Sequence, residues 1–540
     1  MPSALIVGSG PAATGAALAL TARGDMQVTV IDIGLQLDEA KRAVVRDMAH
    51  SPPAEWSGTD VALISRQPMA SGRALPEKRS YGSDFPFRDV GQLVGIAAAE
   101  HVNRSVVSGA YGGFSNVWGS QLMPYSDATL RRWPVSFEAM VPHYKAILKS
   151  VPLAAEEDDL AHQFPLLAPR SPLPSPAART EAVLSRYARH RRRLNEMGIT
   201  VGKARLAFDG GSCVRCGLCM TGCPYSLIYS ASQTIDELRL TRQVAYHPGF
   251  LAVEVGETPD GAWVEALESA TGRVRRFAAD RVFLACGAVG TTRLVQHSMR
   301  HYDTDITMGE SVQFVLPFVS RQGGPDPRTT DDFTLNQFNM LVTPGANAAD
   351  TSLLHFYTFN PAMVEALPAA LRRDIAGSTG ALLRRLSVAL GYLPSWVSPR
   401  LVLRASPPGA ASPVAGLALR REAVSWWTNS MLRRVLSRVA GGGHLLDLWP
   451  LLPALRMADG AKSYHLGASF PHLSPAQGAA QARARAVGKP SSDLLGRVAP
   501  WQRIHLVDAS VFPDVPATTF TFTIMANAHR IASLATRGDG

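Results

Sequence analysis

The sequence of 540 residues is poor in cysteine, in lysine and in charge of either sign. It contains five cysteines and seven lysines beside 47 arginines, and charged residues make up only 18%. An excess of arginine over lysine usually reflects the base composition of a genome, so the formal net charge of +10 does not by itself predict nucleic-acid binding. The chain also lacks a motif that interleaves aromatic and basic residues, and we therefore expect no nucleic acid among its partners.

Long uninterrupted hydrophobic runs are missing as well. Apolar residues make up 46% of the chain, and the mean hydropathy is +0.02. This balance excludes a disordered chain and a multi-span membrane protein. Because a single core stops growing well below this length, two packed domains are the expected arrangement.

The first 22 residues carry no charged side chain, but they also lack the basic start of a signal peptide. We therefore predict neither a signal peptide nor a transmembrane segment, and we expect a cytoplasmic protein. Residues 382–403 and 425–455 mix leucine, tryptophan and paired arginines, a composition that also suits a basic amphipathic surface in peripheral contact with a membrane. Pro394 and Pro399 interrupt the first stretch, so burial in the second domain or against a subunit is the alternative reading.

The N-terminal residues have the pattern of a dinucleotide-binding βαβ unit. A short apolar strand at 4–7 is followed by a helix-prone stretch at 12–22 and by a β-branched strand at 28–31, which ends on Asp32. Gly8, Gly10 and Ala13 occupy the G-x-G-x-x-G/A positions, and Gly15 follows two residues later. Such a turn brings a pyrophosphate to a helix N-terminus, and an acid at the position of Asp32 accepts hydrogen bonds from ribose hydroxyls.

Two later segments continue the same kind of domain. Residues 281–295 again read as strand, glycine turn and helix around Gly287, and residues 504–512 read as a strand before a helix-prone stretch at 523–535. Between them, residues 311–361 alternate as antiparallel strands do, and helices are expected near 361–390 and 421–440. We therefore predict an α/β fold, in which a Rossmann-like dinucleotide-binding domain, discontinuous in sequence, is joined to a second domain built on an antiparallel sheet plus helices.

The predicted boundaries follow from this order, although the identity of the nucleotide comes only from the resemblance described below. The segments are 1–135 for the first part of the FAD-binding domain, 136–200 for a helical excursion, 201–310 for the cysteine loop and the second part, 311–460 for the substrate domain, and 461–540 for the catalytic histidine segment and the closing part.

Four of the five cysteines lie within eleven residues, as Cys213, Cys216, Cys219 and Cys223. Their spacing, C-x2-C-x2-C-x3-C-P, is the ferredoxin run, which predicts a [3Fe–4S] cluster held by three thiolates or a [4Fe–4S] cluster held by all four. Structural zinc is the main alternative, although its ligands usually come as two separated C-x2-C pairs. A metal-free loop, with thiols packed or paired as disulfides, is the other alternative. Cys286, beside the Gly287 turn, is interpreted as core packing.

Three segments together resemble the glucose–methanol–choline (GMC) family of oxidoreductases. YGGFSNVWGSQLMPYS at 111–126 is similar to the flavin-covering segment of that family, and RIHLVDASVFPDVPATTFTFTIMANAHRIASLA at 503–535 is similar to its closing signature. Tyr464-His465-Leu466-Gly467 lies where the family places its catalytic histidine. The resemblance implies that FAD is bound, and the cofactor contacts expected from it and from the glycine turns are Gly8, Gly10, Ala13, Gly15, Asp32, Gly112, Gly113, Asn116, Val244, Gly287, Asp508, Ala509 and Thr519.

The same resemblance assigns the chemistry. Alcohol oxidation needs a hydride acceptor, which FAD supplies, and a base for the hydroxyl proton, which the resemblance identifies as His465. The family usually has a second histidine or an asparagine where this sequence has Thr519. Threonine can donate one hydrogen bond but is no strong base, so Asn527 or Asn116 is a candidate substitute, and Asn527 joins His465 and Thr519 as a predicted catalytic residue.

The cysteine loop is similar to that of the bacterial FAD-dependent sugar dehydrogenases of this family, which carry an iron–sulfur cluster. We therefore expect a dehydrogenase that oxidises a sugar, polyol or glycosidic alcohol and passes electrons through a cluster to a cytochrome, a quinone or a carrier protein. Three alternatives remain: an oxidase that reduces oxygen and uses the cysteines structurally, a redox-neutral flavin lyase, and a membrane- or partner-bound electron-transfer subunit with residues 382–403 exposed.

Overall fold

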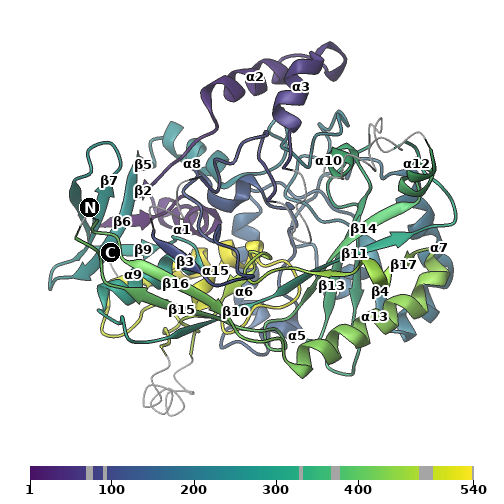
Figure 1. Cartoon of the computed structure of the whole chain (residues 1–540). Coiled ribbons are helices and arrows are strands. Elements are labelled where there is room, and N and C mark those ends of the chain that lie inside the picture. The colour runs from purple at the N-terminus through teal and green to yellow at the C-terminus, as the bar shows by residue number, and fades with distance from the viewer. Residues whose placement is uncertain are drawn as a thin grey trace.

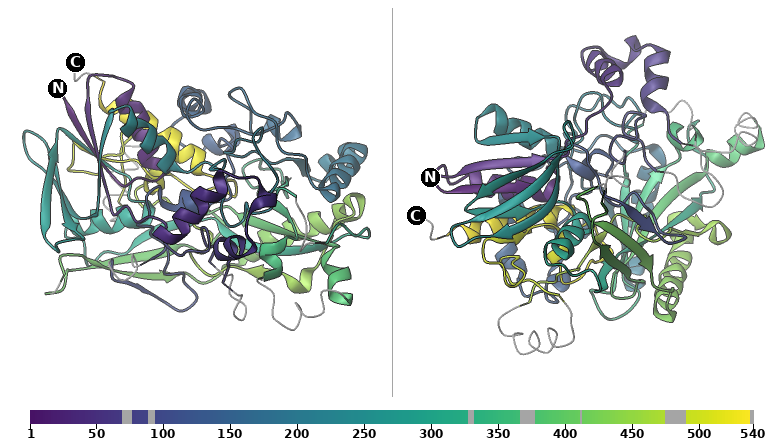
Figure 2. Two further views of the ribbon diagram at one scale, coloured as in Figure 1. Left: turned by 90° about the horizontal axis from the view of Figure 1, so that it is seen from above. Right: turned by 60° about the vertical axis from the view of Figure 1, so that its left-hand side comes forward.

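A computed structural model describes residues 1–68, 77–88, 94–326, 332–365, 377–410, 412–473 and 490–537. Two regions can be distinguished in it (Figures 1 and 2): a parallel sheet with its helices beside both N- and C-terminal segments, and a larger antiparallel sheet at the opposite end.

The first region is the predicted discontinuous Rossmann-like domain. Five parallel strands pair in the order β20-β9-β1-β2-β5, so the sheet draws on the start, middle and end of the chain. The strands are β1 (Ser3–Val7), β2 (Gln27–Asp32), β5 (Val244–Pro248), β9 (Arg281–Leu284) and β20 (Ile504–Leu506). The helices of this region are α1 (Pro11–Thr21), α8 (Ala231–Leu240), α9 (Ala288–Ser298) and α15 (Thr521–Ala535). A three-stranded antiparallel sheet, with β6 (Phe250–Glu257), β7 (Ala262–Glu268) and β8 (Val274–Ala279), completes it.

The N-terminal and C-terminal helices lie side by side (Figure 2) because a glycine lets their backbones touch. A Cβ atom on Gly15 of α1 would stand 2.1 Å from the carbonyl oxygen of Met525 in α15. Real Cβ atoms do not approach a backbone oxygen so closely, so any side chain here would force the two helices apart. Gly15 therefore allows the first and the last helix of the chain to pack against each other.

The second region is built on a seven-stranded sheet with the order β17-β11-β14-β13-β12-β4, in which β18 also pairs with β11. Its strands are β4 (Ile199–Lys203), β11 (Val312–Val319), β12 (Phe338–Val342), β13 (Ser352–Thr358), β14 (Leu386–Leu393), β17 (Trp449–Pro450) and β18 (Arg456–Met457). A second sheet links the two regions through β3 (Ile96–Ala98), β10 (Ile306–Glu310), β15 (Leu401–Ser406), β16 (Gly416–Arg421) and β19 (Leu466–Gly467). This arrangement confirms the predicted fold class.

The large sheet uses its two faces differently, as the period of two in its strands requires. One face, with Phe314, Phe356 and Ala389, packs into an apolar core against Met431 and Val435 of α13 (Trp426–Leu446). Helix α7 (Ala178–Glu196) joins the same core. The side chains between these positions point the other way, toward the parallel sheet, and they form one wall of the cavity described below.

Shorter elements complete the described chain: α2 (Glu39–Ala49), α3 (Gly58–Ser65), α5 (Asp127–Leu130), α6 (Phe137–Ile147), α10 (Pro361–Glu365) and α12 (Ser378–Leu383), with 3-10 turns at Pro53–Glu55, Gly113–Asn116, Asp159–His162, Leu452–Ala454 and Ala509–Val511. The pair α2 and α3 projects from the body of the molecule at the top of Figure 1.

One stretch folds differently from its predicted secondary structure. Of the helix expected near 361–390, α10 and α12 are short, residues 366–376 lie outside the described residues, and the remainder is strand β14. The apolar residues of β14 alternate between the core and the cavity wall, and Pro394 ends the strand one residue later. Helix α13 is confirmed, five residues displaced at its start from the expected 421–440.

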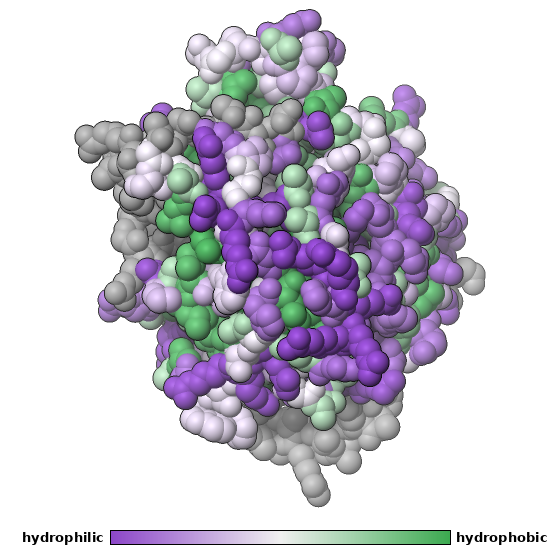
Figure 3. All heavy atoms as spheres, turned by 90° about the vertical axis from the view of Figure 1, so that its right-hand side faces the viewer, coloured by the Kyte–Doolittle hydropathy of each residue, from purple (hydrophilic) through white to green (hydrophobic). Residues whose placement is uncertain are grey.

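Residues 382–403 do not form an exposed apolar surface, because β14 is a central strand of the large sheet and β15 is paired on both sides. In the other stretch, Trp426 and Trp427 at the start of α13 are 66% and 65% exposed. The face opposite the parallel sheet shows a broad hydrophilic band with smaller hydrophobic areas (Figure 3). None of the helices in the described part of the chain combines the length and the apolar character needed to span a bilayer.

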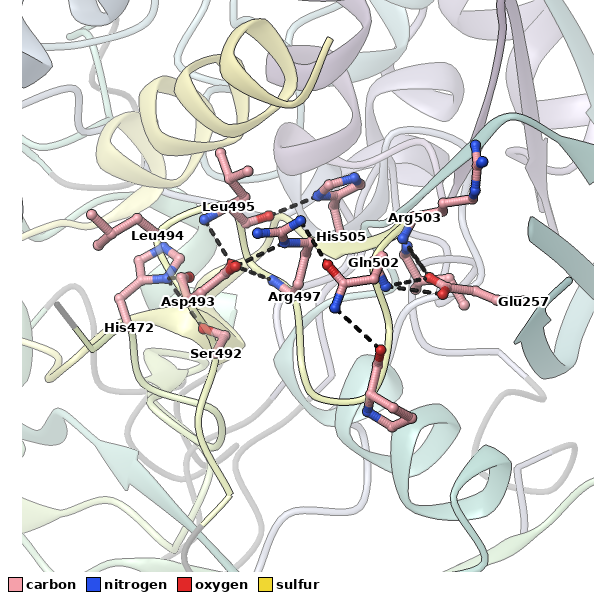
Figure 4. Close-up of polar contacts among 12 residues, drawn as sticks. Glu257, His472, Ser492, Asp493, Leu494, Leu495, Arg497, Gln502, Arg503 and His505 are labelled. Atoms are coloured by element: carbon pink, nitrogen blue, oxygen red, sulfur yellow. Dashed lines mark hydrogen bonds and ion pairs between the residues drawn. The ribbon is translucent and has the colours of Figure 1, made fainter. Parts of the chain in front are cut away.

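The segment that leads into β20 is held by a polar network (Figure 4). Glu257, at the end of β6, accepts backbone N–H groups from Gln502 and Ile504, at 2.8 and 2.9 Å. Asp493 accepts from the backbone of Leu495 and from the guanidinium of Arg497. These bonds satisfy donors of a loop that has no regular secondary structure, and they fix the register of the last parallel strand.

We predict that Gly15→Ala destabilises the protein by about 3 kcal/mol or more, because its Cβ would force α1 and α15 apart. The control is Gly58→Ala at the start of α3, where a Cβ meets nothing within 4 Å and should change stability by less than about 0.5 kcal/mol. Thermal unfolding of both variants measures the difference. Equal melting temperatures would contradict the assigned contact.

Candidate active site

A cavity of about 630 Å³ extends from the carboxyl edge of the parallel sheet to the inner face of the large antiparallel sheet. Its size lies within the range of sites for cofactors and small molecules, and most of its lining residues are apolar. Residues of both regions line the cavity, so it lies where the two regions meet.

Three backbone turns border the cavity on the side of the parallel sheet. Gly8, with φ of +107°, lies so close to β9 that a Cβ would be 2.5 Å from the carbonyl oxygen of Ala285. Gly113, with φ of +59°, would place a Cβ 3.3 Å from the Cα atom of Gly10. The third turn contains Gly287. The turns therefore pack backbone against backbone, and side chains at Gly8 and Gly113 would separate them.

A serine connects two of these turns to the acid at the end of β2. The hydroxyl of Ser9 donates to the carboxylate of Asp32 and accepts the N–H of Gly112 at 2.9 Å. Burial raises the pKa of Asp32 to about 7, while the bond from Ser9 acts in the opposite direction. A carboxylate at this edge of a parallel sheet is placed to accept hydrogen bonds from ribose hydroxyls.

Most of the predicted cofactor contacts line the cavity: Gly8, Gly10, Asp32, Gly113, Gly287, Asp508, Ala509 and Thr519. The others support its walls from behind. Ala13 is fully buried in α1, and Gly15 contacts α15. Gly112 and Asn116 brace the glycine turn, the latter by donating its amide to the carbonyls of Tyr111 and Gly113 at 3.0 and 2.7 Å. Val244 pairs with Val28 in the sheet. Their roles toward a cofactor stay predictions.

The segment with His465 is held against β10 by backbone and carboxylate bonds. Strand β19 pairs with β10, and Ser311 donates its N–H to the carbonyl of His465 at 3.0 Å. The buried carboxylate of Glu310 accepts the N–H of Ala461 at 2.8 Å and the hydroxyl of Ser463 at 3.3 Å. Burial raises the pKa of Glu310 to about 7.

The imidazole of His465 is packed between two aromatic rings inside the cavity. It stacks on Tyr392, with ring centroids 4.6 Å apart and planes 15° apart, and lies 4.7 Å from the ring of Phe520. Its Nδ1 is buried and has no hydrogen-bond partner, and the same holds for the hydroxyl of Thr519, which lines the same cavity. Burial lowers the pKa of His465 to about 4, so the ring is neutral at pH 7. The site therefore presents a neutral base and a hydroxyl donor, both unpaired.

Asn527 has other partners. Its amide lies 3.3 Å from the Nε2 of His472, and its oxygen accepts the Nε–H of Arg530 at 2.9 Å. It is fully buried and is not among the residues that line the cavity. His465 and Thr519 thus line the same cavity, whereas Asn527 contacts His472. The ring of His472 in turn bonds to the backbone of Asp493 (Figure 4).

Sequence reasoning missed the opposite wall of the cavity. Gln313, His355 and Tyr392 project from β11, β13 and β14 into it. The strands β11 and β13 were predicted from alternation, whereas a helix was expected over most of β14. Alternation also does not tell which face borders a cavity and which packs against a helix. Cys286 packs partly buried against the apolar core, as interpreted from the sequence, and it also lines the cavity, because β9 ends at Leu284 and the cysteine lies in the turn beyond it.

The four clustered cysteines lie around one small pocket of their own, and all five cysteines of the chain are free thiols. The loop turns through positive φ at Arg215, Gly217 and Gly222, which lets it wrap around a centre. Among the described residues, no three His, Cys, Asp or Glu side chains are arranged to hold a single metal ion.

The cysteine loop adjoins the main cavity. Met220, next to Cys219, lines the cavity, and so does Lys78, whose ammonium donates to the carbonyl of Trp118 at 3.1 Å. Burial lowers the pKa of Lys78 to about 8, and the nearby Cys219 acts to raise it. On its other side, the loop is covered by α2 and α3, where Tyr225 donates to the carbonyl of Ser51 at 2.7 Å.

We predict that Glu310→Gln changes how stability depends on pH. Because the folded pKa of about 7 lies above the ordinary 4.5, the folded state binds an extra proton between these values, and the wild type loses stability as pH rises through this window. The variant cannot ionise, so its stability relative to the wild type should increase by up to about 3 kcal/mol between pH 5 and pH 8. Melting temperatures at both pH values test this; parallel profiles would show that the carboxyl titrates normally.

No family model matches the chain, and no curated protein matches it in sequence. In structure it is similar to pyridoxine 4-oxidase from Mesorbium loti, with a TM-score of 0.60 and 14% identity over 99% of both chains. It is also similar to an FAD-dependent oxidoreductase from Chaetomium thermophilum, with a TM-score of 0.59 and 13% identity over 100% of both chains. The chain therefore has the α/β fold of GMC oxidoreductases, in which a parallel Rossmann-like sheet is joined to an antiparallel substrate-domain sheet.

Proposed function

We propose that this protein is an FAD-dependent oxidoreductase that oxidises the CH–OH group of a small-molecule alcohol. The observation that carries the proposal is the pair of buried, unpartnered groups, His465 Nδ1 and Thr519 Oγ1, in the same cavity as three glycine turns and Asp32. The fold shared with an oxidase and with an FAD-dependent oxidoreductase supports it.

The residues of the cavity fit the cofactor. The turn through Gly8 and Gly10 lies before the N-terminus of α1, whose unpaired N–H groups favour a pyrophosphate, and no side chain caps that end. Asp32 would accept the ribose hydroxyls, while Gly113, Gly287 and Ala509 leave room for a flat ring system. When bound, FAD supplies the hydride acceptor.

His465 would take the proton of the substrate hydroxyl. Its ring is neutral above about pH 4, its position is fixed by Tyr392 and Phe520, and its Nδ1 has no competing partner. Thr519 would donate a hydrogen bond to the substrate oxygen as negative charge develops there. A catalytic role for Asn527 stays a prediction, since its amide and oxygen already have partners.

We further propose that Cys213, Cys216, Cys219 and Cys223 hold an iron–sulfur cluster, with three or all four thiolates as ligands. The support is that all four are free and border one pocket, and that Met220 brings the loop to the cavity. Such a cluster would supply one-electron transfer toward an external acceptor, a cytochrome, a quinone or a carrier protein. The enzyme would then be a dehydrogenase, and a sugar, polyol or glycosidic alcohol is the substrate class that the sequence resemblance predicts.

An oxidase with a structural cysteine loop is the second candidate. The observation in its favour is the fold shared with a protein named as an oxidase. In that case the purified protein would contain flavin but no iron, and it would release peroxide with its substrate.

We predict that His465→Ala lowers the turnover number at least about hundredfold while the flavin content stays unchanged, because the base for the hydroxyl proton is lost. His529→Ala is the matched control: this histidine also belongs to the C-terminal region but faces His143, with their Nδ1 atoms 2.9 Å apart, and turnover should stay within about twofold. Anaerobic stopped-flow reduction of the flavin gives both rates. A rate within threefold of wild type would remove His465 from the mechanism.

We predict that Cys216→Ser lowers the iron content and slows electron transfer to a one-electron dye more than it slows reduction of the flavin by substrate. Serine is a poor ligand for iron in a thiolate site, whereas the cavity keeps all its lining residues. Cys286→Ser, outside the loop, should keep its iron. Equal losses in the two rates, or a wild type without iron, would contradict the relay.

A further inference from the structure

The inner wall of the cavity is one face of the large sheet, and its register sets which side chains lie next to one another. Gln313 of β11 is paired with Tyr392 of β14, and His355 of β13 is paired with Leu390. Because side chains two residues apart share a face, Val315 and Val388 line the same wall. This wall faces the space next to His465, where a substrate would lie.

In this wall the amide of Gln313 donates to the hydroxyl of Tyr392 at 3.0 Å. Val315, Val388 and Leu390 contribute apolar side chains, as do Phe359 and Met363 of the same cavity. A sugar bound here would bury several hydroxyls against hydrocarbon, and each unpaired hydroxyl would weaken binding. An apolar ring, in contrast, gains by leaving water and stacks on tyrosine and phenylalanine rings.

Three further polar residues are buried together at one side of the wall: Gln121, Asn339 and His355. Asn339 is the cross-strand partner of His355, and its amide donates to the Oε1 of Gln121 at 3.4 Å. Each residue still has one buried atom without a partner: Nε2 of Gln121, Oδ1 of Asn339 and Nε2 of His355. Their exposed fractions are 4%, 0% and 4%, and Gln121 and His355 line the cavity.

Such unpaired atoms are costly unless a ligand completes their bonds. The group is uncharged: two members are amides, and burial together with nearby His465 lowers the pKa of His355 to about 3. It therefore suits a neutral hydroxyl, carbonyl or amide rather than a carboxylate, phosphate or ammonium group.

The group is one aromatic ring away from the proposed base. The ring of Tyr392 lies 4.6 Å from that of His465 and 5.4 Å from that of His355. A substrate with a single ring can thus place one hydroxyl at His465 and a second polar group at Gln121 and His355.

We propose that Gln121 and His355, braced by Asn339, form a subsite for a neutral polar group of the substrate, and that the substrate is a ring-bearing apolar alcohol with one such group. This inference rests on the proposed function and replaces the sugar, polyol or glycosidic alcohol by a different class. Gln121 and His355 bind the distal group, and the hydrocarbon of the ring packs on the sheet.

The experiment compares three alcohols on the holoenzyme by anaerobic flavin reduction: 4-hydroxybenzyl alcohol, benzyl alcohol, which lacks the distal hydroxyl, and D-glucose. We expect kcat/KM for 4-hydroxybenzyl alcohol to exceed that for benzyl alcohol about tenfold, the usual value of a neutral hydrogen bond to a buried group. D-Glucose should be slower than either by about a hundredfold or more.

The variants Gln121→Leu and His355→Leu test whether the subsite causes the preference. Each should reduce the advantage of the distal hydroxyl to about twofold, chiefly through KM; the readout is the ratio of kcat/KM for the two alcohols within each variant. An advantage that persists in both variants would overturn the subsite, and D-glucose as the best substrate would overturn the substrate class while leaving the alcohol oxidation intact.

If none of the three alcohols reduces the flavin, the proposed function fails for these substrates. The subsite is then tested separately, by measuring how tightly the alcohols bind. Dissociation constants from flavin difference spectra should then be lower for 4-hydroxybenzyl alcohol than for benzyl alcohol, with the difference lost in Gln121→Leu. Equal constants in the wild type would overturn the inference.

Discussion

The close contact of backbone with backbone around the cavity is the constraint on which the rest of this structure depends. Gly8 meets the strand end at Ala285, Gly113 meets Gly10, and Gly15 meets Met525. These contacts join segments that lie far apart in the chain. A Cβ atom at Gly8 or Gly15 would overlap backbone atoms, and one at Gly113 would be tightly packed, so glycine at these positions allows the segments to approach this closely. The cavity lies beside the turns at Gly8 and Gly113.

The large antiparallel sheet forms the opposite wall of the cavity. One face carries the aromatic core against α13, and the other supplies the wall with Gln313, His355 and Tyr392. Glu310 and strand β10 then hold the His465 segment at the edge between the two regions. His465 is therefore positioned by β10 of the linking sheet and by Tyr392 of the large sheet, while the glycine turns belong to the region of the parallel sheet.

The sequence allowed the fold class and the glycine turns to be predicted because these depend on local patterns. The βαβ signature around Gly8 and Asp32 is encoded within about thirty residues, and the histidine segment was found by resemblance. The polar group of Gln121, Asn339 and His355 could not be predicted, because Gln121 lies 218 positions from Asn339 and meets it only in the folded chain, while Asn339 and His355 meet through the register of β12 and β13. Asn527 shows the reverse: a polar residue in a suggestive motif can bond to a neighbouring loop instead of the cavity.

The division of labour between alternate residues of β11, β13 and β14 has an evolutionary consequence. In each strand, one set of alternate residues packs against α13 and the other set lines the cavity. A substitution therefore alters either the packing of the core or the lining of the cavity, and seldom both. Substitutions can therefore change the lining of the cavity without lowering the free energy of unfolding. In such a sheet, the cavity and the hydrophobic core can change independently of one another.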